Sequence, residues 1–148
     1  MKLVAVAGGF DPLHIGHLRQ IKEAKKLGDE LIIILAKDDQ LKEKKGYVFM
    51  YFKERKEILE SIVGVDMVVE NIDRDLTCAQ SLCTYRPNIF AKGGDRTPEN
   101  MPPSEIDVCK LIDCEIIYDV GGEKIQSSSF LVENRTKNNH KKEDQKEG

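Results

Sequence analysis

Two histidines stand three residues apart, directly after a glycine-rich turn. The segment that carries them is Gly8-Gly9-Phe10-Asp11-Pro12-Leu13-His14-Ile15-Gly16-His17. A glycine turn that runs into a helix presents free backbone N–H groups and a positive dipole end to an anion. Residues three apart on a helix share a face, so both imidazoles can point at what the turn holds. Such a pair can donate hydrogen bonds to phosphate oxygens that gain charge in a transition state.

Other roles for these histidines stay open at this stage. A histidine at a helix start often caps the helix or packs as a ring. The His-x-x-His spacing also binds zinc, and a zinc hydrolase would use His14, His17 and a carboxylate such as Asp11. The glycine turn and the apolar run before it favour phosphate binding over both.

The rest of the chain predicts the elements that position this turn. Apolar runs predict strands at Leu3–Ala7, Leu31–Ala36, Val65–Val69, Ile89–Ala91 and Glu115–Tyr118. Helical spacing predicts helices over Ile15–Leu27, about Tyr51–Ile62, about Asp75–Tyr85 and near Ser104–Leu111. The stretch Lys42–Gly46 is predicted to be a flexible loop. Alternating strands and helices predict an α/β fold with a doubly wound parallel sheet of about five strands, which binds ligands at the carboxyl ends of its strands.

Length and composition narrow the class of protein. The 148 residues make one domain, expected at 1–134, followed by a polar tail at 135–148 that lacks apolar residues and is expected to be disordered. A net charge of −3 gives no reason to expect nucleic acid or a membrane as partner, and we expect a cytoplasmic location. The four cysteines form two pairs with a spacing of five, which favours core cysteines over a zinc knuckle.

Several motifs together resemble one known family. Gly9 to His17 is similar to the G-x-F-D-x-x-H-x-G-H signature of the cytidylyltransferase-like nucleotidyltransferases. Lys92-Gly93-Gly94-Asp95 resembles the K-G-G-D of heptose-phosphate adenylyltransferases, and Ser127-Ser128-Ser129 occupies the place of the family's closing serine motif. The resemblance spans about Lys2 to Asn134.

This resemblance implies a Rossmann-like fold and attack of a substrate phosphate on the α-phosphate of a nucleoside triphosphate, with release of pyrophosphate. It implies ATP or CTP as donor, with Mg²⁺, and a sugar phosphate such as heptose 1-phosphate as acceptor. Some cytidylyltransferases carry an arginine just before the closing motif. In this sequence Lys124 is the only basic residue there, and the missing arginine favours ATP over CTP. Alternatives are glycerol-3-phosphate cytidylyltransferase or FAD synthase activity, and a non-catalytic nucleotide-binding regulatory module. A homodimer is also implied.

Each matching position takes an expected role from the family. The nucleotide-binding set is Gly8, Gly9, Phe10, Asp11, Gly16, Asp95, Ser127, Ser128 and Ser129. The catalytic set is His14, His17, Lys44 and Lys45, with Arg55 and Lys92 on a phosphate and no protein-bound metal. Simpler roles remain for some of them: the lysines can belong to a solvated loop, and Arg55 can pair with a nearby glutamate. Asp11 can hold a histidine or the loop in place, or cap the helix.

Overall fold

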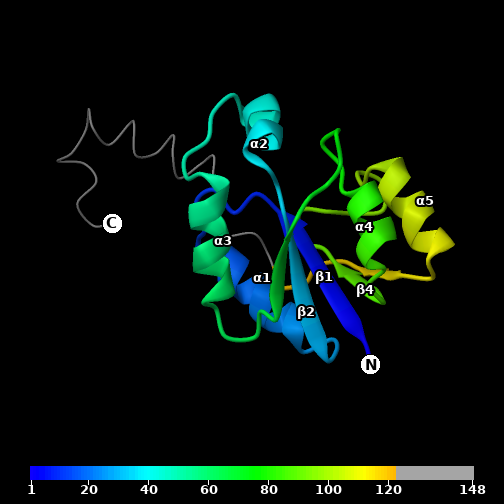
Figure 1. The fold of residues 1–148 in the computed structure, drawn as a ribbon. Helices are drawn as coiled ribbons and strands as arrows, with labels where there is room; N and C mark the ends of the chain where they lie inside the picture. Colours follow the sequence, from blue (N-terminus) through cyan, green and yellow to red (C-terminus); the bar gives the residue numbers. More distant parts are fainter. Residues whose placement is uncertain (123–148) are drawn as a thin grey trace.

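A computed structural model describes residues 1–122 of the protein (Figure 1). In chain order its elements are β1 (Leu3–Gly8), α1 (Ile15–Lys25), β2 (Glu30–Leu35), α2 (Asp38–Lys45), α3 (Phe52–Glu60), β3 (Met67–Glu70), α4 (Ala79–Tyr85), β4 (Ile89–Ala91), α5 (Pro103–Leu111) and β5 (Glu115–Ile117). The predicted tail at 135–148 and the three serines at 127–129 lie outside the described residues. No helix of the described part is long and apolar enough to cross a membrane.

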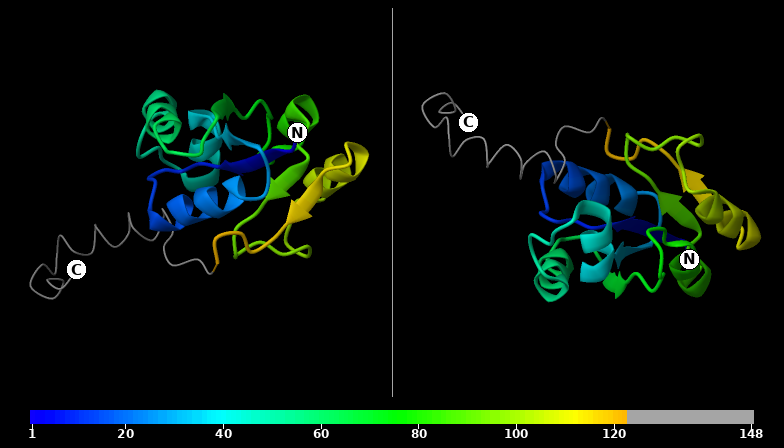
Figure 2. Two further views of the ribbon diagram at one scale, coloured as in Figure 1. Left: turned by 90° about the horizontal axis from the view of Figure 1, so that it is seen from below. Right: turned by 90° about the horizontal axis from the view of Figure 1, so that it is seen from above.

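The five strands form one parallel sheet in the order β3-β2-β1-β4-β5, which confirms the predicted doubly wound fold. Successive strand residues point to opposite faces, so each strand contributes side chains to the hydrophobic core on either face of the sheet. On β1, Val4 and Val6 join a cluster with Ile21 of α1 and Leu59 of α3. Ala5 joins the cluster under α4 and α5 on the other face. Figure 2 shows these helix pairs on opposite sides of the sheet.

The chain changes direction across the sheet between β1 and β4. From β1 it moves outward through β2 to β3, and then returns to place β4 on the other side of β1. At such a switch point the connections leave neighbouring strands in opposite directions, which opens a crevice at the carboxyl ends. The loops that follow β1 and β4 therefore border the crevice where a ligand is expected.

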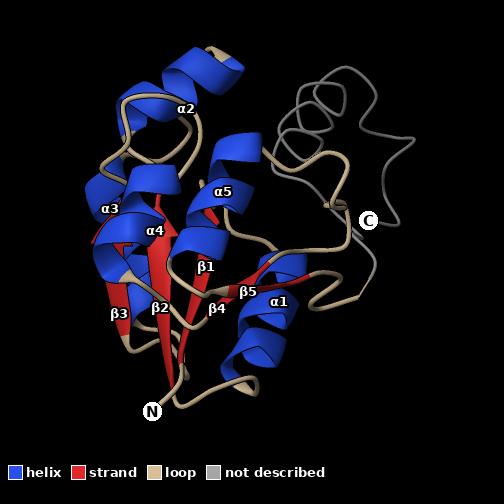
Figure 3. Cartoon of the chain, turned by 90° about the vertical axis from the view of Figure 1, so that its right-hand side faces the viewer, coloured by secondary structure: helices blue, strands red, loops and turns tan. Residues whose placement is uncertain are grey.

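Helix α2 occupies the stretch Lys42–Gly46 that the sequence predicted to be a flexible loop. Its residues are mostly charged, so the apolar periodicity that predicts a helix is missing. The helix is instead held by Leu41, which is 4% exposed, and ends at Gly46 with a positive φ of 87°. In Figure 3 α2 lies at the end of the molecule opposite the N-terminus, beyond the sheet.

Helix α4 begins at Ala79, four residues later than its predicted start at Asp75. Polar side chains in the preceding loop bond locally instead of extending the helix. The buried carboxylate of Asp73 accepts hydrogen bonds from the backbone N–H groups of Gln80 (2.8 Å) and Ser81 (2.9 Å). Asp73 therefore caps the first turn of α4 and fixes its start.

The cysteines are free thiols, as their spacing suggested. Cys78, Cys109 and Cys114 are buried in the α4/α5 core, whereas Cys83 is exposed on α4. Burial raises the pKa of the Cys78 thiol well above its usual range, and the nearby Glu105 carboxylate adds to that effect. Cys78 is therefore a packing residue that stays protonated.

Arg55 of α3 is the largest fully buried side chain, and it joins three segments at the carboxyl end of the sheet. Its Nη1 donates to the carbonyls of Gly9 (2.9 Å) and Ala36 (2.8 Å), which follow β1 and β2. Its Nε donates to the carbonyl of Met50 (2.8 Å), and its Nη2 to Asp38 Oδ1 (2.7 Å). A buried guanidinium with this many partners is stable because its charge and its donors are satisfied.

Replacing Arg55 by methionine is expected to lower the free energy of unfolding by about 3–5 kcal/mol, because it leaves buried carbonyls and a carboxylate without their donor. For a domain of this size that corresponds to a fall in melting temperature of about 10 °C. Lys56→Met is the matched control, since Lys56 makes only a partly exposed ion pair with Glu60 and should change stability by less than about 0.5 kcal/mol. Equal melting temperatures for the two variants would contradict the role given to Arg55.

Candidate active site

A cavity opens at the switch point between β1 and β4. One wall is the end of β1 and the start of α1, and the other is made by the loops after β4 and β5. The lining residues are Ala7, Gly8, Phe10, His14, Gly16, His17, Gln20, Lys92, Gly93, Gly94, Asp95, Arg96, Val120, Gly121 and Gly122. The cavity thus gathers seven of the twelve predicted site residues that the structure describes: Gly8, Phe10, His14, Gly16, His17, Lys92 and Asp95.

His14 and His17 are fixed by the first turn of α1. His14 Nδ1 accepts from the Gly16 N–H and His17 Nδ1 accepts from the His14 N–H, both at 3.1 Å. The two rings stack with centroids 3.8 Å apart, and the Phe10 ring lies 4.7 Å from the His17 ring. Because each Nδ1 is an acceptor, these hydrogen bonds assign the proton of each neutral ring to Nε2. Each histidine therefore has a capping nitrogen and a second nitrogen suited to donate to a ligand.

Two glycines leave the room that this arrangement needs. A Cβ on Gly16 would lie 3.0 Å from Cε1 of the His14 ring, so a side chain there would push the ring away. A Cβ on Gly9 would lie 2.7 Å from Cδ2 of Leu41, which packs α2 against the turn. Glycine at these two positions thus permits the close packing of the turn against Leu41 and the His14 ring.

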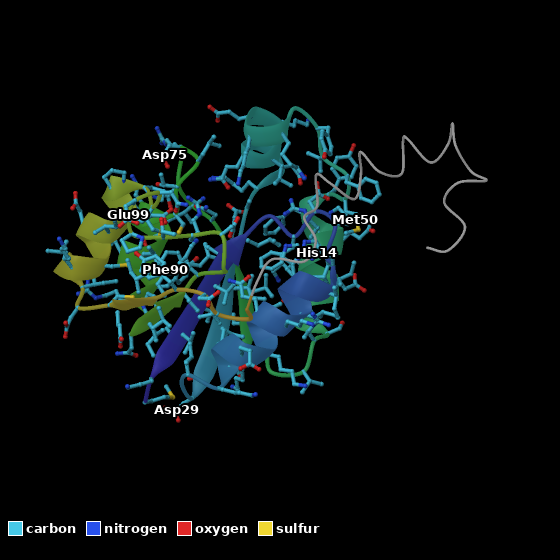
Figure 4. All side chains as sticks on the ribbon, turned by 180° about the vertical axis from the view of Figure 1, so that it is seen from behind. His14, Asp29, Met50, Asp75, Phe90 and Glu99 are labelled. Atoms are coloured by element: carbon cyan, nitrogen blue, oxygen red, sulfur yellow. The ribbon has the colours of Figure 1, made fainter. Side chains whose placement is uncertain are left out.

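Asp11 faces away from the cavity and holds a neighbouring loop. Its side chain is fully buried, and its carboxylate accepts from the backbone N–H groups of Phe49 (2.7 Å) and Met50 (2.6 Å). Lys45 Nζ donates to the Asp11 carbonyl (2.8 Å) and lies 3.4 Å from its carboxylate. Figure 4 labels Met50, whose N–H is one of these donors, and His14, which follows Asp11 by three residues. Asp11 therefore anchors residues 49–50 to the histidine turn.

Three of the predicted cationic residues, Lys44, Lys45 and Arg55, lie in surroundings that differ from one another. Lys45 is bound to Asp11 and lies 4.8 Å from the Tyr47 ring centroid, while Lys44 is exposed on α2. The guanidinium of Arg55 is buried and surrounded by carbonyls and Asp38, so these contacts support a positioning role in place of the expected phosphate contact. The sequence left open that Arg55 pairs with a nearby glutamate; in the structure it does pair with a carboxylate, but the partner is Asp38.

The second wall of the cavity is built from closely packed glycine loops. A Cβ on Gly94 would lie 2.6 Å from the Gly122 carbonyl oxygen, and a Cβ on Gly121 would lie 2.8 Å from the backbone of Gln20. Lys92 enters this wall at the end of β4, with its Nζ 4.6 Å from the centroid of the Phe90 ring. The loops after β4 and β5 therefore pack on each other and on α1, and they enclose the deep end of the cavity.

Sequence reasoning missed Gln20 and Arg96, which also line the cavity. Gln20 follows His17 by three residues, so helical spacing alone places it on the same face of α1. Its Nε2 lies 3.5 Å from the Ala91 carbonyl. Arg96 follows the K-G-G-D stretch and donates to the Asn100 carbonyl (2.9 Å), and no pattern in the sequence distinguished it from other loop cations.

The cavity can accept an anion through several kinds of donor. It combines two imidazoles, two cationic side chains and the backbone of glycine turns at the start of α1. Within residues 1–122 no three histidine, cysteine or acidic side chains are grouped so that they could hold a metal ion. The described site therefore has the donor chemistry of phosphate binding, and it supplies no ligand set for the zinc hydrolase.

Comparison with known proteins gives the same family as the sequence motifs. The family model described as "Cytidylyltransferase-like" matches residues 5–136. The FAD synthase of Thermococcus sibiricus is 37% identical over 120 residues, which cover 78% of this chain and 79% of that protein. The bifunctional protein HldE of Syntrophotalea carbinolica is 38% identical over 101 residues, 67% of this chain but 20% of that protein. The chain thus spans about a fifth of the length of this longer relative.

Solved structures share the fold. A lipopolysaccharide core biosynthesis protein from Thermoplasma volcanium superposes with a TM-score of 0.69 at 27% identity, covering 80% of this chain and 95% of that one. Thermotoga maritima TmcAL, solved with alpha-thio ATP, gives a TM-score of 0.64 at 15% identity, covering 95% of this chain and 51% of that one. The motif, the cavity and these matches agree: the chain belongs to the cytidylyltransferase-like family of nucleotidyltransferases.

Proposed function

We propose that the protein transfers an adenylyl group from ATP to a small phosphorylated acceptor and releases pyrophosphate. The observation that carries this proposal is the pair His14 and His17, held by their Nδ1 atoms at the edge of a glycine-lined cavity. FAD, the product named for the archaeal relatives, contains an adenylyl group joined to a flavin phosphate. That product and the absence of an arginine before the closing serines both favour ATP over CTP.

The reaction needs no covalent protein intermediate. An oxygen of the acceptor phosphate forms a bond to the α-phosphorus of ATP while the bond from that phosphorus to the bridging oxygen breaks, and pyrophosphate leaves with the electron pair. The acceptor phosphate is already a nucleophile at neutral pH, so the protein contributes position and charge stabilisation. In this proposal the Nε2–H groups of His14 and His17 donate to the phosphate oxygens as charge moves onto pyrophosphate.

Other residues of the family motifs complete the binding site. The backbone of Gly8 and Gly9 and the start of α1 receive the triphosphate, with Gly16 leaving room for His14. Lys44 and Lys92 add positive charge near the phosphates, and Lys45 acts through Asp11. Asp95 accepts from a ribose hydroxyl or the base, and Ser127, Ser128 and Ser129 take the phosphate-binding role that the family motif implies.

Magnesium would reach this site together with the triphosphate. Asp95 is the only carboxylate among the cavity-lining residues of the described part, which fits a metal held mainly by phosphate oxygens and water. When bound, Mg²⁺ would neutralise part of the charge of the triphosphate. The histidines and lysines of this chain then bind the phosphate oxygens that remain.

Two acceptor classes fit the family resemblance. One is a sugar phosphate such as heptose 1-phosphate, supported by the K-G-G-D stretch and the HldE relatives. The other is flavin mononucleotide, supported by the FAD synthases that match over most of their length. We also propose a homodimer, from the family resemblance.

A pyrophosphate-release assay with Mg²⁺ tests the activity, with ATP and CTP each combined with heptose 1-phosphate, glycerol 3-phosphate and flavin mononucleotide. We expect release with ATP and one acceptor, and little with CTP. Release with CTP alone would contradict the choice of base. Tight ATP binding without release for any acceptor would favour the regulatory module.

Two substitutions at His17 separate catalysis from helix capping. In His17→Asn the amide oxygen can replace Nδ1 as the acceptor for the His14 N–H, but no donor replaces Nε2–H. We expect a melting temperature within about 2 °C of the wild type and a fall in kcat of about 10²–10³, the loss typical of one transition-state donor. His17→Gln places its amide near Nε2 and should retain more activity. Wild-type turnover in folded His17→Asn protein would refute the mechanism.

A further inference from the structure

The loop between α2 and α3, residues 46–51, is fixed to the histidine turn yet exposes aromatic side chains. Phe49 is 46% exposed and Tyr51 is 68% exposed, and Tyr47 is half-buried beside Lys45. We propose that this loop binds the acceptor of the proposed reaction, and that the acceptor is a phosphomonoester with a planar aromatic ring system, the class of flavin mononucleotide. The inference rests on the proposed function and decides between its two acceptor classes.

Two buried charged side chains, Asp11 and Arg55, hold the backbone of the loop in place. The buried Asp11 carboxylate binds the N–H groups of Phe49 and Met50, and Arg55 Nε binds the Met50 carbonyl at 2.8 Å. Asp11 precedes His14 by three residues, so their Cα atoms are at most about 11 Å apart. The loop is thus held close to the proposed reaction centre by buried charged groups, and little ordering remains to be done when a ligand binds.

The side chains of the loop are suited to a ring system. Aromatic rings held at a fixed backbone present apolar area and π-faces on which a planar heterocycle can stack. A sugar phosphate instead needs several hydrogen-bonding side chains for its hydroxyls. In residues 46–51 the only side-chain hydrogen-bonding groups are the hydroxyls of Tyr47 and Tyr51. The loop therefore complements a flavin-like ring better than a heptose.

Positive charge borders the same loop. Lys42, Lys44 and Lys45 occupy the last turn of α2 immediately before it, and Lys53 follows Tyr51. Glu43 and Glu54 stand among these lysines, and Asp11 is buried and already accepts from two amides and Lys45. A phosphomonoester near these lysines would find net positive charge, so the surface combines the two features that a ring-bearing phosphate requires.

The position of the loop also suits the displacement. The cavity proposed for ATP lies on the β4 side of the histidine turn, and residues 46–51 do not line it. Through Asp11 and Arg55 the loop lies on the β2 side of that turn. An acceptor on the β2 side and a nucleotide on the β4 side would approach the α-phosphorus from different directions, as an in-line displacement requires.

Flavin fluorescence tests the inference without requiring turnover. Titrating the full chain into flavin mononucleotide should quench the fluorescence as the ring stacks, and the Kd should rise about tenfold in Tyr51→Ala and in Phe49→Ala. Tyr51 makes no side-chain cap to α3, so its loss should not unfold the helix. Leu111→Ala, which removes an exposed apolar side chain from α5, is the matched control and should leave the Kd unchanged. Riboflavin, which lacks the phosphate, should bind more weakly than flavin mononucleotide.

The outcomes separate this inference from the proposed function. Pyrophosphate release with flavin mononucleotide, reduced in Tyr51→Ala at subsaturating acceptor but with an unchanged KM for ATP, would support both. Release with heptose 1-phosphate and not with flavin mononucleotide would overturn the inference and leave nucleotidyl transfer intact. An unchanged Kd in both aromatic variants would also overturn it, as would a dimer that dissociates in Tyr51→Ala, since the rings would then form a contact between copies of the chain.

Discussion

The buried carboxylate of Asp11 is the contact on which the arrangement of the site depends. A carboxylate without solvent must be satisfied by nearby donors, and here they are two backbone N–H groups of residues 49–50 and the ammonium of Lys45. One charge thus joins the turn after β1, the end of α2 and the loop before α3. Arg55 connects the same loop to the ends of β1 and β2. Together the two groups place the histidines, and the helix cap then orients their rings.

The charged residues of the family motifs fall into two groups with different contacts. The charges that are most deeply buried, Asp11 and Arg55, bind protein groups, whereas Lys92, Asp95 and Arg96 line the cavity. His14 and His17 do both, because their Nδ1 atoms accept from the helix backbone and their rings line the cavity. A site built in this way keeps its geometry without substrate, which lowers the cost of ordering it during the reaction.

Much of the fold was predictable because its strands are buried on both faces and its helices on one. Such elements show clear patterns, and β2, with five of six residues buried, is the plainest case. Helix α2 escaped prediction because Leu41 is its only apolar residue and its other contacts are polar, such as Asp38 with Arg55 and Lys45 with Asp11. The cavity histidines followed from their spacing after a glycine turn. The role of Arg55 did not, because a sequence shows the charge of a side chain but not which carbonyls converge on it. Gln20 was predictable in principle from its spacing after His17.

The hydrogen bonds of Arg55 also have a consequence for how ligands enter and leave. One guanidinium donates to the ends of β1 and β2 and to the loop before α3. A shift of any one of these segments therefore breaks a buried hydrogen bond to Arg55. The opposite wall, built on the loops after β4 and β5, is held to α1 by glycine packing and by the long contact between Gln20 and Ala91. Van der Waals contacts of that kind separate at lower cost than a buried charged network. Within the described part of the chain, we therefore expect the histidine side of the cavity to be the more rigid one and the β4–β5 side to shift more readily when a ligand enters or leaves.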